Sequence, residues 1–165
     1  MTANQKIAQS ALLAAQGRMP SVALDPGWCL RVVRLIVEHA LFENRYEMYS
    51  RWLVAGTTAR PGTDAERVRA ARANPFASDF EASMKQLGLT VPMFEREPGD
   101  LVFNHKLASP YGHVAVLMTR DLALENINPR SRPTGIRLPV ANLVLTPVES
   151  VEWTLCARLP DPDPN

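Results

Sequence analysis

The sequence predicts an α+β domain, in which helices come first along the chain and an antiparallel sheet follows. Apolar residues recur at helical spacing in the first half, beginning with Ile7, Ala11 and Ala15. From Pro98 onward, short apolar runs alternate with turn residues, which is the pattern of strands. Because the two patterns are separated along the chain rather than interleaved, they favour helices packed on one antiparallel sheet.

Two helices are expected in the first third of the chain. The first covers residues 3–16 and ends at Gly17, since glycine readily adopts the left-handed conformation that closes a helix. The second follows Asp25-Pro26-Gly27, because Asp suits the N-cap and Pro suits the first helical position. Its helical pattern runs over residues 28–53 and is apolar on most sides in its first half, which predicts a central position.

Two shorter helices are expected after a loop rich in glycine. Residues 64–73 are mostly charged residues and alanine, which predicts a solvated helix. Residues 77–87 form the other helix, capped by Ser78 or Asp79.

Strands are expected throughout the second half. Apolar runs between turn residues predict them at 100–103, 113–118, 122–127, 136–138, 143–145 and 151–159. A tight turn at Thr119-Arg120-Asp121 makes the second and third of these runs a hairpin.

A single domain is expected to span residues 1–165. The chain shows no internal repeat and no low-complexity linker, and its length suits one core. The folded core is expected from about residue 20 to 158, and the proline-rich end at 159–165 is expected to be a flexible tail.

The composition excludes several classes of function. A net charge of +1 gives no overall field that would recruit nucleic acid, so no nucleic-acid partner is expected. The arginines of one middle segment are interpreted as a solvated helical face; they are Arg60, Arg67, Arg69 and Arg72. No apolar run reaches the roughly 18 residues of a membrane span, so no membrane insertion is expected. The N-terminal apolar stretch is too short for a signal peptide, which predicts cytoplasmic synthesis.

The cysteine count also limits the chemistry. Cys29 and Cys156 lie far apart and form no CxxC pair, so neither a disulfide framework nor a four-cysteine zinc site is expected. No metal and no cofactor is expected, since Glu38-His39 lacks a second histidine at helical spacing.

Cys29 is the first candidate for catalysis. It lies in the opening turn of the helix that follows Asp25, where free N–H groups and the helix dipole favour a thiolate. Its backbone N–H can also point at an oxyanion, which acyl transfer requires. The competing interpretation is a buried structural cysteine, because free cysteines are among the most buried residues.

His113 is the second candidate. Gly112 precedes it and an apolar strand leaves from it, so its imidazole can face the helix that carries Cys29. A core histidine bonded to backbone is the competing interpretation.

A third polar residue has to orient the imidazole through its other nitrogen. Hairpin geometry can bring Glu125 or Asn126 beside His113. Successive strand residues point to opposite faces, so only one of the two can be the direct partner, and the pattern leaves the choice open. Asn128 is a more distant candidate.

Four segments resemble the NlpC-type and CHAP-type cell-wall peptidases, which share a papain-like core; CHAP stands for cysteine, histidine-dependent amidohydrolase/peptidase. The segments are GWCLRVV (27–33), PGDLVF (98–103), YGHVAVLM (111–118) and LEN (124–126). CHAP members commonly carry Glu at the third position, which corresponds to Glu125, with an Asn two residues on, where this chain has Ile127. The Asp-Cys-Ser-Gly of NlpC-type members is replaced here by Gly27-Trp28-Cys29-Leu30.

The resemblance implies a cysteine hydrolase that cleaves amide bonds, with Cys29, His113 and Glu125 as catalytic residues and Glu125 preferred over Asn126. It implies peptidoglycan or a peptide as substrate, cut by a stem-peptide endopeptidase or an N-acetylmuramoyl-L-alanine amidase, as in phage endolysins. Such an enzyme would reach the cell wall through lysis or phage machinery. Two alternatives stay open: a cytosolic amidase with another substrate, and a catalytically silent papain-like fold that acts as a binding or regulatory protein.

Overall fold

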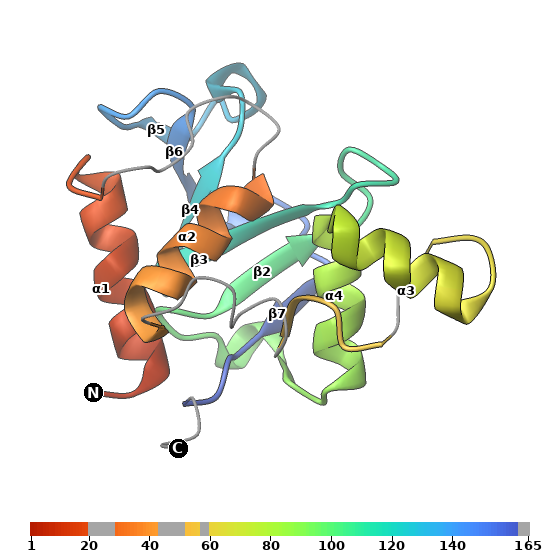
Figure 1. Ribbon diagram of the computed structural model, residues 1–165. Helices are drawn as coiled ribbons and strands as arrows, with labels where there is room; N and C mark the ends of the chain where they lie inside the picture. Colours follow the sequence, from red (N-terminus) through yellow and green to blue (C-terminus); the bar gives the residue numbers. More distant parts are fainter. Residues whose placement is uncertain (20–28, 43–51, 57–59, 162–165) are drawn as a thin grey trace.

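The computed structural model of the chain describes residues 1–19, 29–42, 52–56 and 60–161 (Figure 1). It confirms the expected α+β class, with helices first and an antiparallel sheet after them. The α-helices of the described residues are α1 (Ala3–Ala15), α2 (Cys29–Leu41), α3 (Asp64–Ala73) and α4 (Ala77–Gln86). The strands are β1 (Thr90–Val91), β2 (Leu101–Asn104), β3 (His113–Thr119), β4 (Leu122–Asn126), β5 (Ile136–Arg137), β6 (Leu143–Pro147) and β7 (Leu155–Ala157).

Within the described residues the strands form one sheet in the order β1-β7-β2-β3-β4-β6-β5, and every neighbouring pair is antiparallel. The expected hairpin is β3 and β4, which places Val116 opposite Leu124 and has an irregular register near the turn. The expected strand at 151–159 is shorter, and only its part at β7 pairs. The chain turns before β7, because the Trp153 N–H bonds back to the Val151 carbonyl at 3.1 Å.

The sheet has a core on each of its faces. α1 and α2 lie across β3, with α2 also on β4, and α4 packs against β2 and β3 (Figure 1). Alternate strand residues such as Val114 and Val116 pack against these helices. The residues between them, such as Ala115, pack on the other face with Trp153 and Cys156.

The core begins earlier than the sequence predicts. Ile7 and Ala11 of α1 are completely buried in the same cluster as α2 and the sheet, so the expected start at about residue 20 is wrong. Gly99 fixes the contact between α1 and the start of β2, because a Cβ there would lie 2.1 Å from the Asn4 carbonyl oxygen. α1 is therefore part of the folded unit.

The central helix α2 is shorter than expected, since it ends at Leu41. The rings of Phe42 and Trp52 lie 5.4 Å apart. A continuous helix would separate these two positions by about 15 Å along its axis. The helix of the described residues therefore ends before the helical pattern of the sequence does. The expected cap Asp25-Pro26-Gly27 lies outside the described residues.

The two shorter helices begin through local capping. α3 starts as expected, with Thr63 and Glu66 forming a capping box. The N-cap of α4 is Phe76 rather than Ser78 or Asp79, and its N–H donates to the Asp79 carboxylate at 2.7 Å. The Ser78 hydroxyl donates instead to the Pro110 carbonyl.

The flexible tail expected at 159–165 is wrong for the part that the structure describes, residues 159–161. Leu159 is buried in the core, and Asp161 accepts a hydrogen bond from the Ala3 N–H. These contacts hold the chain against α1 as far as residue 161.

Candidate active site

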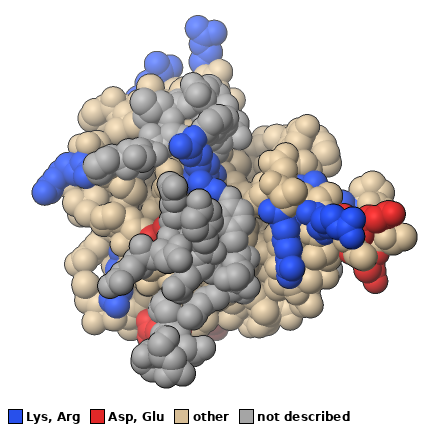
Figure 2. Space-filling view, viewed as in Figure 1, with Lys and Arg blue, Asp and Glu red and all other residues tan. Residues whose placement is uncertain are grey.

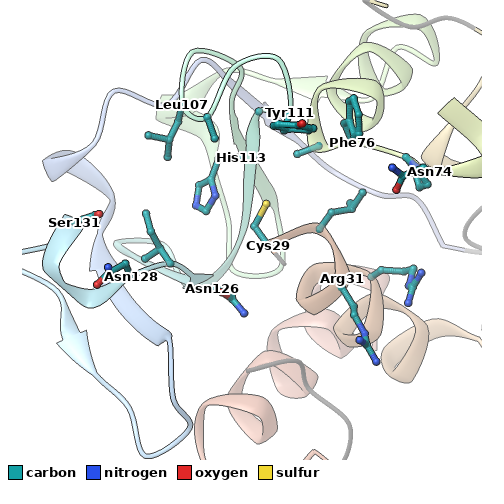
Figure 3. A pocket seen from close by; sticks show the side chains of 17 residues that line it. Cys29, Arg31, Asn74, Phe76, Leu107, Tyr111, His113, Asn126, Asn128 and Ser131 are labelled. Atoms are coloured by element: carbon teal, nitrogen blue, oxygen red, sulfur yellow. The ribbon is translucent and has the colours of Figure 1, made fainter. Parts of the chain in front are cut away.

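Cys29 is the first described residue of α2, and its side chain is buried, with 9% of the residue exposed. The helix packs on β3 and β4, which directs Cys29 to the end of the sheet where β3 begins. Figure 3 shows its sulfur next to the His113 imidazole. The competing interpretation from the sequence is a buried structural cysteine. The imidazole beside the Cys29 sulfur does not fit that interpretation.

His113 opens β3 and is held there by close backbone packing. Gly112 has φ +72°, and a Cβ at this position would meet the Ser78 nitrogen at 3.0 Å. The Ser78 N–H donates to the Tyr111 carbonyl at 2.9 Å, which ties this segment to the first turn of α4. The imidazole is 5% exposed and stacks on the Trp153 ring, with centroids 6.0 Å apart and planes at 18°.

Glu125 is the polar residue that contacts the imidazole. Its Oε1 lies 2.6 Å from His113 Nε2, which leaves Nδ1 as the ring nitrogen on the side of Cys29. The carboxylate is completely buried and accepts hydrogen bonds from Arg132 Nε at 2.7 Å and Nη2 at 3.1 Å, and from the Thr146 hydroxyl. The negative charge is therefore held in one position behind the histidine.

The two alternatives to Glu125 take other positions. Asn126 points to the opposite face of β4, as alternation requires, and lines the cleft in front of Cys29. The Asn128 side chain accepts a hydrogen bond from the Arg130 N–H and lies at the rim of the same cleft (Figure 3). Of the three candidates, Glu125 is therefore the one whose carboxylate bonds to the imidazole.

The electrostatics of the site favour a charged cysteine–histidine pair. Burial raises the pKa of the Cys29 thiol, but the hydrogen bond and charge of His113, together with backbone hydrogen bonds from Val114 and Leu30, lower that pKa below its usual value. Burial lowers the pKa of His113, but hydrogen bonds and charges of Cys29 and Glu125 outweigh it and raise the pKa to about 9. Both directions favour a thiolate beside an imidazolium over a neutral pair.

Glu125 is ionised for a related reason. Burial alone would raise the pKa of its carboxyl group, but hydrogen bonds from His113, Arg132 and Thr146 and the charge of His113 lower it to about 2. The carboxylate can therefore stabilise the imidazolium throughout the neutral range.

Cys29 and His113 open on a cleft of about 760 Å³ (Figure 3). The rings of Phe76 and Tyr111 form part of its wall and meet edge to face, with centroids 4.7 Å apart. Polar groups lie elsewhere on the cleft; they are Arg31, Arg34, Asn74, Asn126, Asn128 and Ser131. The cleft can hold a ligand of several residues against the sulfur.

The sequence patterns do not identify three residues that lie around the site, Thr146, Arg132 and Trp153. Thr146 lies on β6, and the pairing of Ala123 with Thr146 places it diagonally from Glu125, so a known register would have revealed it. Arg132 comes from the segment after a short 3₁₀ helix, and no periodic pattern points to it. Trp153 precedes β7, and only the folded structure brings it to His113.

The other histidines make separate contacts. His39 is exposed on α2 and its Nδ1 lies 2.9 Å from the Ser10 hydroxyl. His105 Nδ1 lies 2.9 Å from the buried Glu81 carboxylate, beside a second cleft. Among the described residues, no group of three His, Cys, Asp or Glu side chains is arranged to hold a metal ion. In the same ranges no helix has both the length and the apolar character needed to cross a membrane.

Comparisons with protein-family models, with curated proteins and with solved structures found no match.

Proposed function

We propose that the chain is a cysteine hydrolase that cleaves amide bonds, with Cys29 as nucleophile, His113 as general base and acid, and Glu125 as the group that orients the imidazole. The observation that carries this proposal is the continuous contact from Cys29 to His113 to Glu125, at the edge of an open cleft. A nucleophile, a base and an orienting carboxylate in this order are the parts that acyl transfer requires.

The reaction would proceed through a thioester. The Cys29 proton moves to His113, and the thiolate forms a bond to the amide carbonyl carbon. The backbone N–H of Cys29, at the start of α2, is the expected donor to the oxyanion. The C–N bond then breaks as His113 protonates the leaving amine. Water, deprotonated by His113, attacks the thioester, which releases the carboxylic acid and restores the thiol.

The substrate class follows from the resemblance to NlpC-type and CHAP-type peptidases. The arrangement of a helix-borne cysteine on an antiparallel sheet, with His113 on β3 and Glu125 on β4, supports a papain-like core of this kind. The proposed substrate is therefore peptidoglycan, cut within the stem peptide or at the N-acetylmuramoyl-L-alanine bond.

The test uses purified peptidoglycan with the wild type, Cys29→Ala and Cys156→Ala. Cys156 is the matched control, because it is the other free cysteine of the chain and lies on the other face of the sheet. Wild type and Cys156→Ala are expected to release free amines, and Cys29→Ala is expected to release none. Fragment masses identify the bond: free stem peptides indicate the amidase, and shortened stems on the glycan indicate the endopeptidase. Equal release by all three proteins, or by none, would contradict the proposal.

A further inference from the structure

The Glu125 carboxylate accepts more hydrogen bonds than the orientation of one imidazole requires. An ionised carboxylate offers about four lone-pair positions to donors. Its Oε1 lies 2.6 Å from His113 Nε2 and accepts from Arg132 Nη2 at 3.1 Å, and its Oε2 accepts from Arg132 Nε at 2.7 Å and from the Thr146 hydroxyl. Each of these positions is therefore filled, and the carboxylate is completely buried.

Arg132 differs from the arginines of the surface. Figure 2 shows Lys and Arg side chains that project from several parts of the viewed face. Only 11% of the Arg132 side chain is exposed, and its guanidinium donates one hydrogen bond to each oxygen of Glu125. Ion pairs at the surface contribute little because water screens them, whereas a pair shielded from water interacts strongly. The charge of Arg132 therefore acts on Glu125 with little screening.

The turn that carries Arg132 is fixed by local hydrogen bonds and by close packing. It follows the 3₁₀ helix η3 (Pro129–Ser131), and the Arg132 N–H donates to the Pro129 carbonyl at 3.1 Å. The Gly135 N–H donates to the Arg132 carbonyl at 2.9 Å. A Cβ at Gly135 would lie 2.5 Å from Val144 Cγ1, so only glycine fits against β6 at this position. The fold therefore holds Arg132 in place independently of its bonds to Glu125.

Arg132 is placed to act on the carboxylate rather than on a ligand. Its neighbours Asn128 and Ser131 line the cleft at Cys29, and Arg132 is not part of that lining (Figure 3). An effect of Arg132 on the reaction therefore has to pass through Glu125 to the imidazole.

The proposed reaction depends on the proton at His113 Nε2. When His113 is an imidazolium, both ring nitrogens carry a proton, and Nε2 donates its proton to Glu125. If this proton passed to the carboxylate, His113 would become neutral and the Cys29 thiolate would lose its positive partner. After His113 has protonated the leaving amine, the same carboxylate faces a neutral ring and needs another positive charge to stay ionised. A guanidinium supplies that charge in both states, because it remains protonated throughout.

We propose that Arg132 is a positioning residue that keeps Glu125 ionised and thereby keeps the Nε2 proton on His113 during each turnover. Thr146 assists by filling another acceptor position of the carboxylate. This inference rests on the proposed function, because it takes His113 as the group that gains and loses protons.

The first measurement follows the protonation of Glu125 directly. The carbon-13 shift of its labelled carboxyl group is recorded as pH is lowered, and the signal is assigned by its loss in Glu125→Gln. The pKa of Glu125 is about 2 with all donors present, and in Arg132→Gln it should rise by about 1 to 3, as expected when a positive neighbour is removed. Arg130→Gln is the matched control, since Arg130 lies on the same turn with an exposed side chain, and it should leave the pKa unchanged.

The second measurement is the kinetics on peptidoglycan fragments. Arg132→Gln should lower kcat about tenfold or more with little change in KM, because it weakens a charge-assisted contact that lies outside the cleft wall. Arg132→Lys keeps the charge but lacks the paired donors, so it should restore most of the Glu125 pKa and part of kcat. Thr146→Val removes one donor without the charge and should raise the Glu125 pKa less than Arg132→Gln does.

The outcomes separate this inference from the proposed function. An unchanged Glu125 pKa in folded Arg132→Gln, or a higher KM with unchanged kcat, would overturn the inference. If circular dichroism shows that Arg132→Gln is unfolded, an unchanged pKa in Thr146→Val together with full activity in Arg132→Lys would overturn it. If the wild type cleaves through Cys29 while Arg132→Gln behaves like Arg130→Gln, the hydrolase proposal stands alone. If the pKa rises as expected but the wild type cleaves nothing, Arg132 keeps Glu125 ionised and the hydrolase proposal fails together with the role in turnover.

Discussion

Cys29 and Cys156 are both buried and lie on opposite faces of the same sheet, yet their surroundings affect the sulfur in opposite directions. Cys29 faces an imidazole, and its pKa is lowered. Burial raises the pKa of Cys156 to about 12, with a further contribution from Asp100, whose carboxylate lies 3.8 Å from the sulfur. Burial acts on both thiols in the same sense, so the charge of the neighbouring group decides which one is reactive.

The two carboxylates behind this contrast have different roles. Asp100 accepts hydrogen bonds from Asn4, from Arg158 and from the Glu97 N–H, which connects α1, the start of β2 and the chain after β7. Asp100 therefore links three parts of the fold. Its carboxylate also lies directly beside the Cys156 sulfur. Glu125 is separated from Cys29 by His113, and so its negative charge favours the imidazolium rather than opposing the thiolate.

Among the proposed variants, replacement of His113 should have the largest effect on the reactivity of Cys29. His113→Ala removes both the base and the group that lowers the Cys29 pKa, so kcat/KM on peptidoglycan fragments should fall by about 10⁴-fold or more. His39→Ala is the control, because His39 is exposed on α2 and bonds to Ser10. Retention of more than a tenth of the wild-type activity would show that His113 is not the base.

Alkylation should separate the two cysteines directly. At pH 7, iodoacetamide should modify Cys29 about 10³-fold faster than Cys156, because the difference in thiolate fraction outweighs the lower intrinsic nucleophilicity of a low-pKa thiol. Peptide mass spectrometry after timed quenching measures both rates in one sample. Equal rates, or faster modification of Cys156, would contradict the assignment of Cys29 as the activated sulfur.

Glu125→Gln should reduce activity by about 10²-fold, since it leaves a hydrogen-bonding group beside Nε2 but removes the charge that favours the imidazolium. The upper edge of the pH profile should move to lower pH, a shift that a purely structural defect would not produce. Glu149→Gln is the matched control at an exposed carboxylate, whose side chain is 89% exposed. An unchanged profile in Glu125→Gln would remove Glu125 from the mechanism.

The pH profile of the wild type tests the charged pair itself. The raised pKa of His113 means that the imidazolium persists as pH rises and is lost through about pH 9. The lowered pKa of Cys29 means that the thiolate persists as pH falls and is lost only below the usual thiol range. Activity should therefore form a plateau that declines about tenfold per pH unit above pH 9. An upper edge near about 6.5, the ordinary histidine value, would contradict the pair.

The smallest expected effect is at Cys156. Asp100→Asn removes a carboxylate that raises the Cys156 pKa, so alkylation of Cys156 should accelerate by up to about tenfold, while burial keeps it slow. The Cys29 rate should not change, because the two sulfurs lie on opposite faces of the sheet. Circular dichroism is needed as a control, since Asp100 also bonds to Arg158. An unchanged Cys156 rate in the folded variant would show that burial alone sets its pKa.

The parts of the fold that depend on local chemistry could be predicted from the sequence. α3 is predicted to the residue, because the charged residues and alanines of 64–73 follow a loop of glycine and proline. The structure adds a capping box of Thr63 and Glu66 at this start. The hairpin of β3 and β4 follows from alternation and a short turn. The end of α2 at Leu41 could not be predicted, because the helical pattern of the sequence continues to residue 53.

At the candidate site, too, local patterns predict one part of the arrangement and tertiary structure decides the rest. Alternation predicts that Glu125 and Asn126 lie on opposite faces, but the choice between them depends on register, and the register shifts between Leu117 and Thr119. Arg132 lies in a segment without regular periodicity, so its contact with the carboxylate is visible only in three dimensions.

The contact between Gly112 and Ser78 couples the shape of the cleft to a helix that takes no part in the proposed chemistry. The wall next to Cys29 includes Ala108 and Tyr111, and α4 holds this wall through the carbonyls of Pro110 and Tyr111. A substitution on the first turn of α4 can thus widen or narrow the space for a substrate without altering the reacting groups. Selection on this short segment offers the chain a route to new substrates while the reaction is preserved.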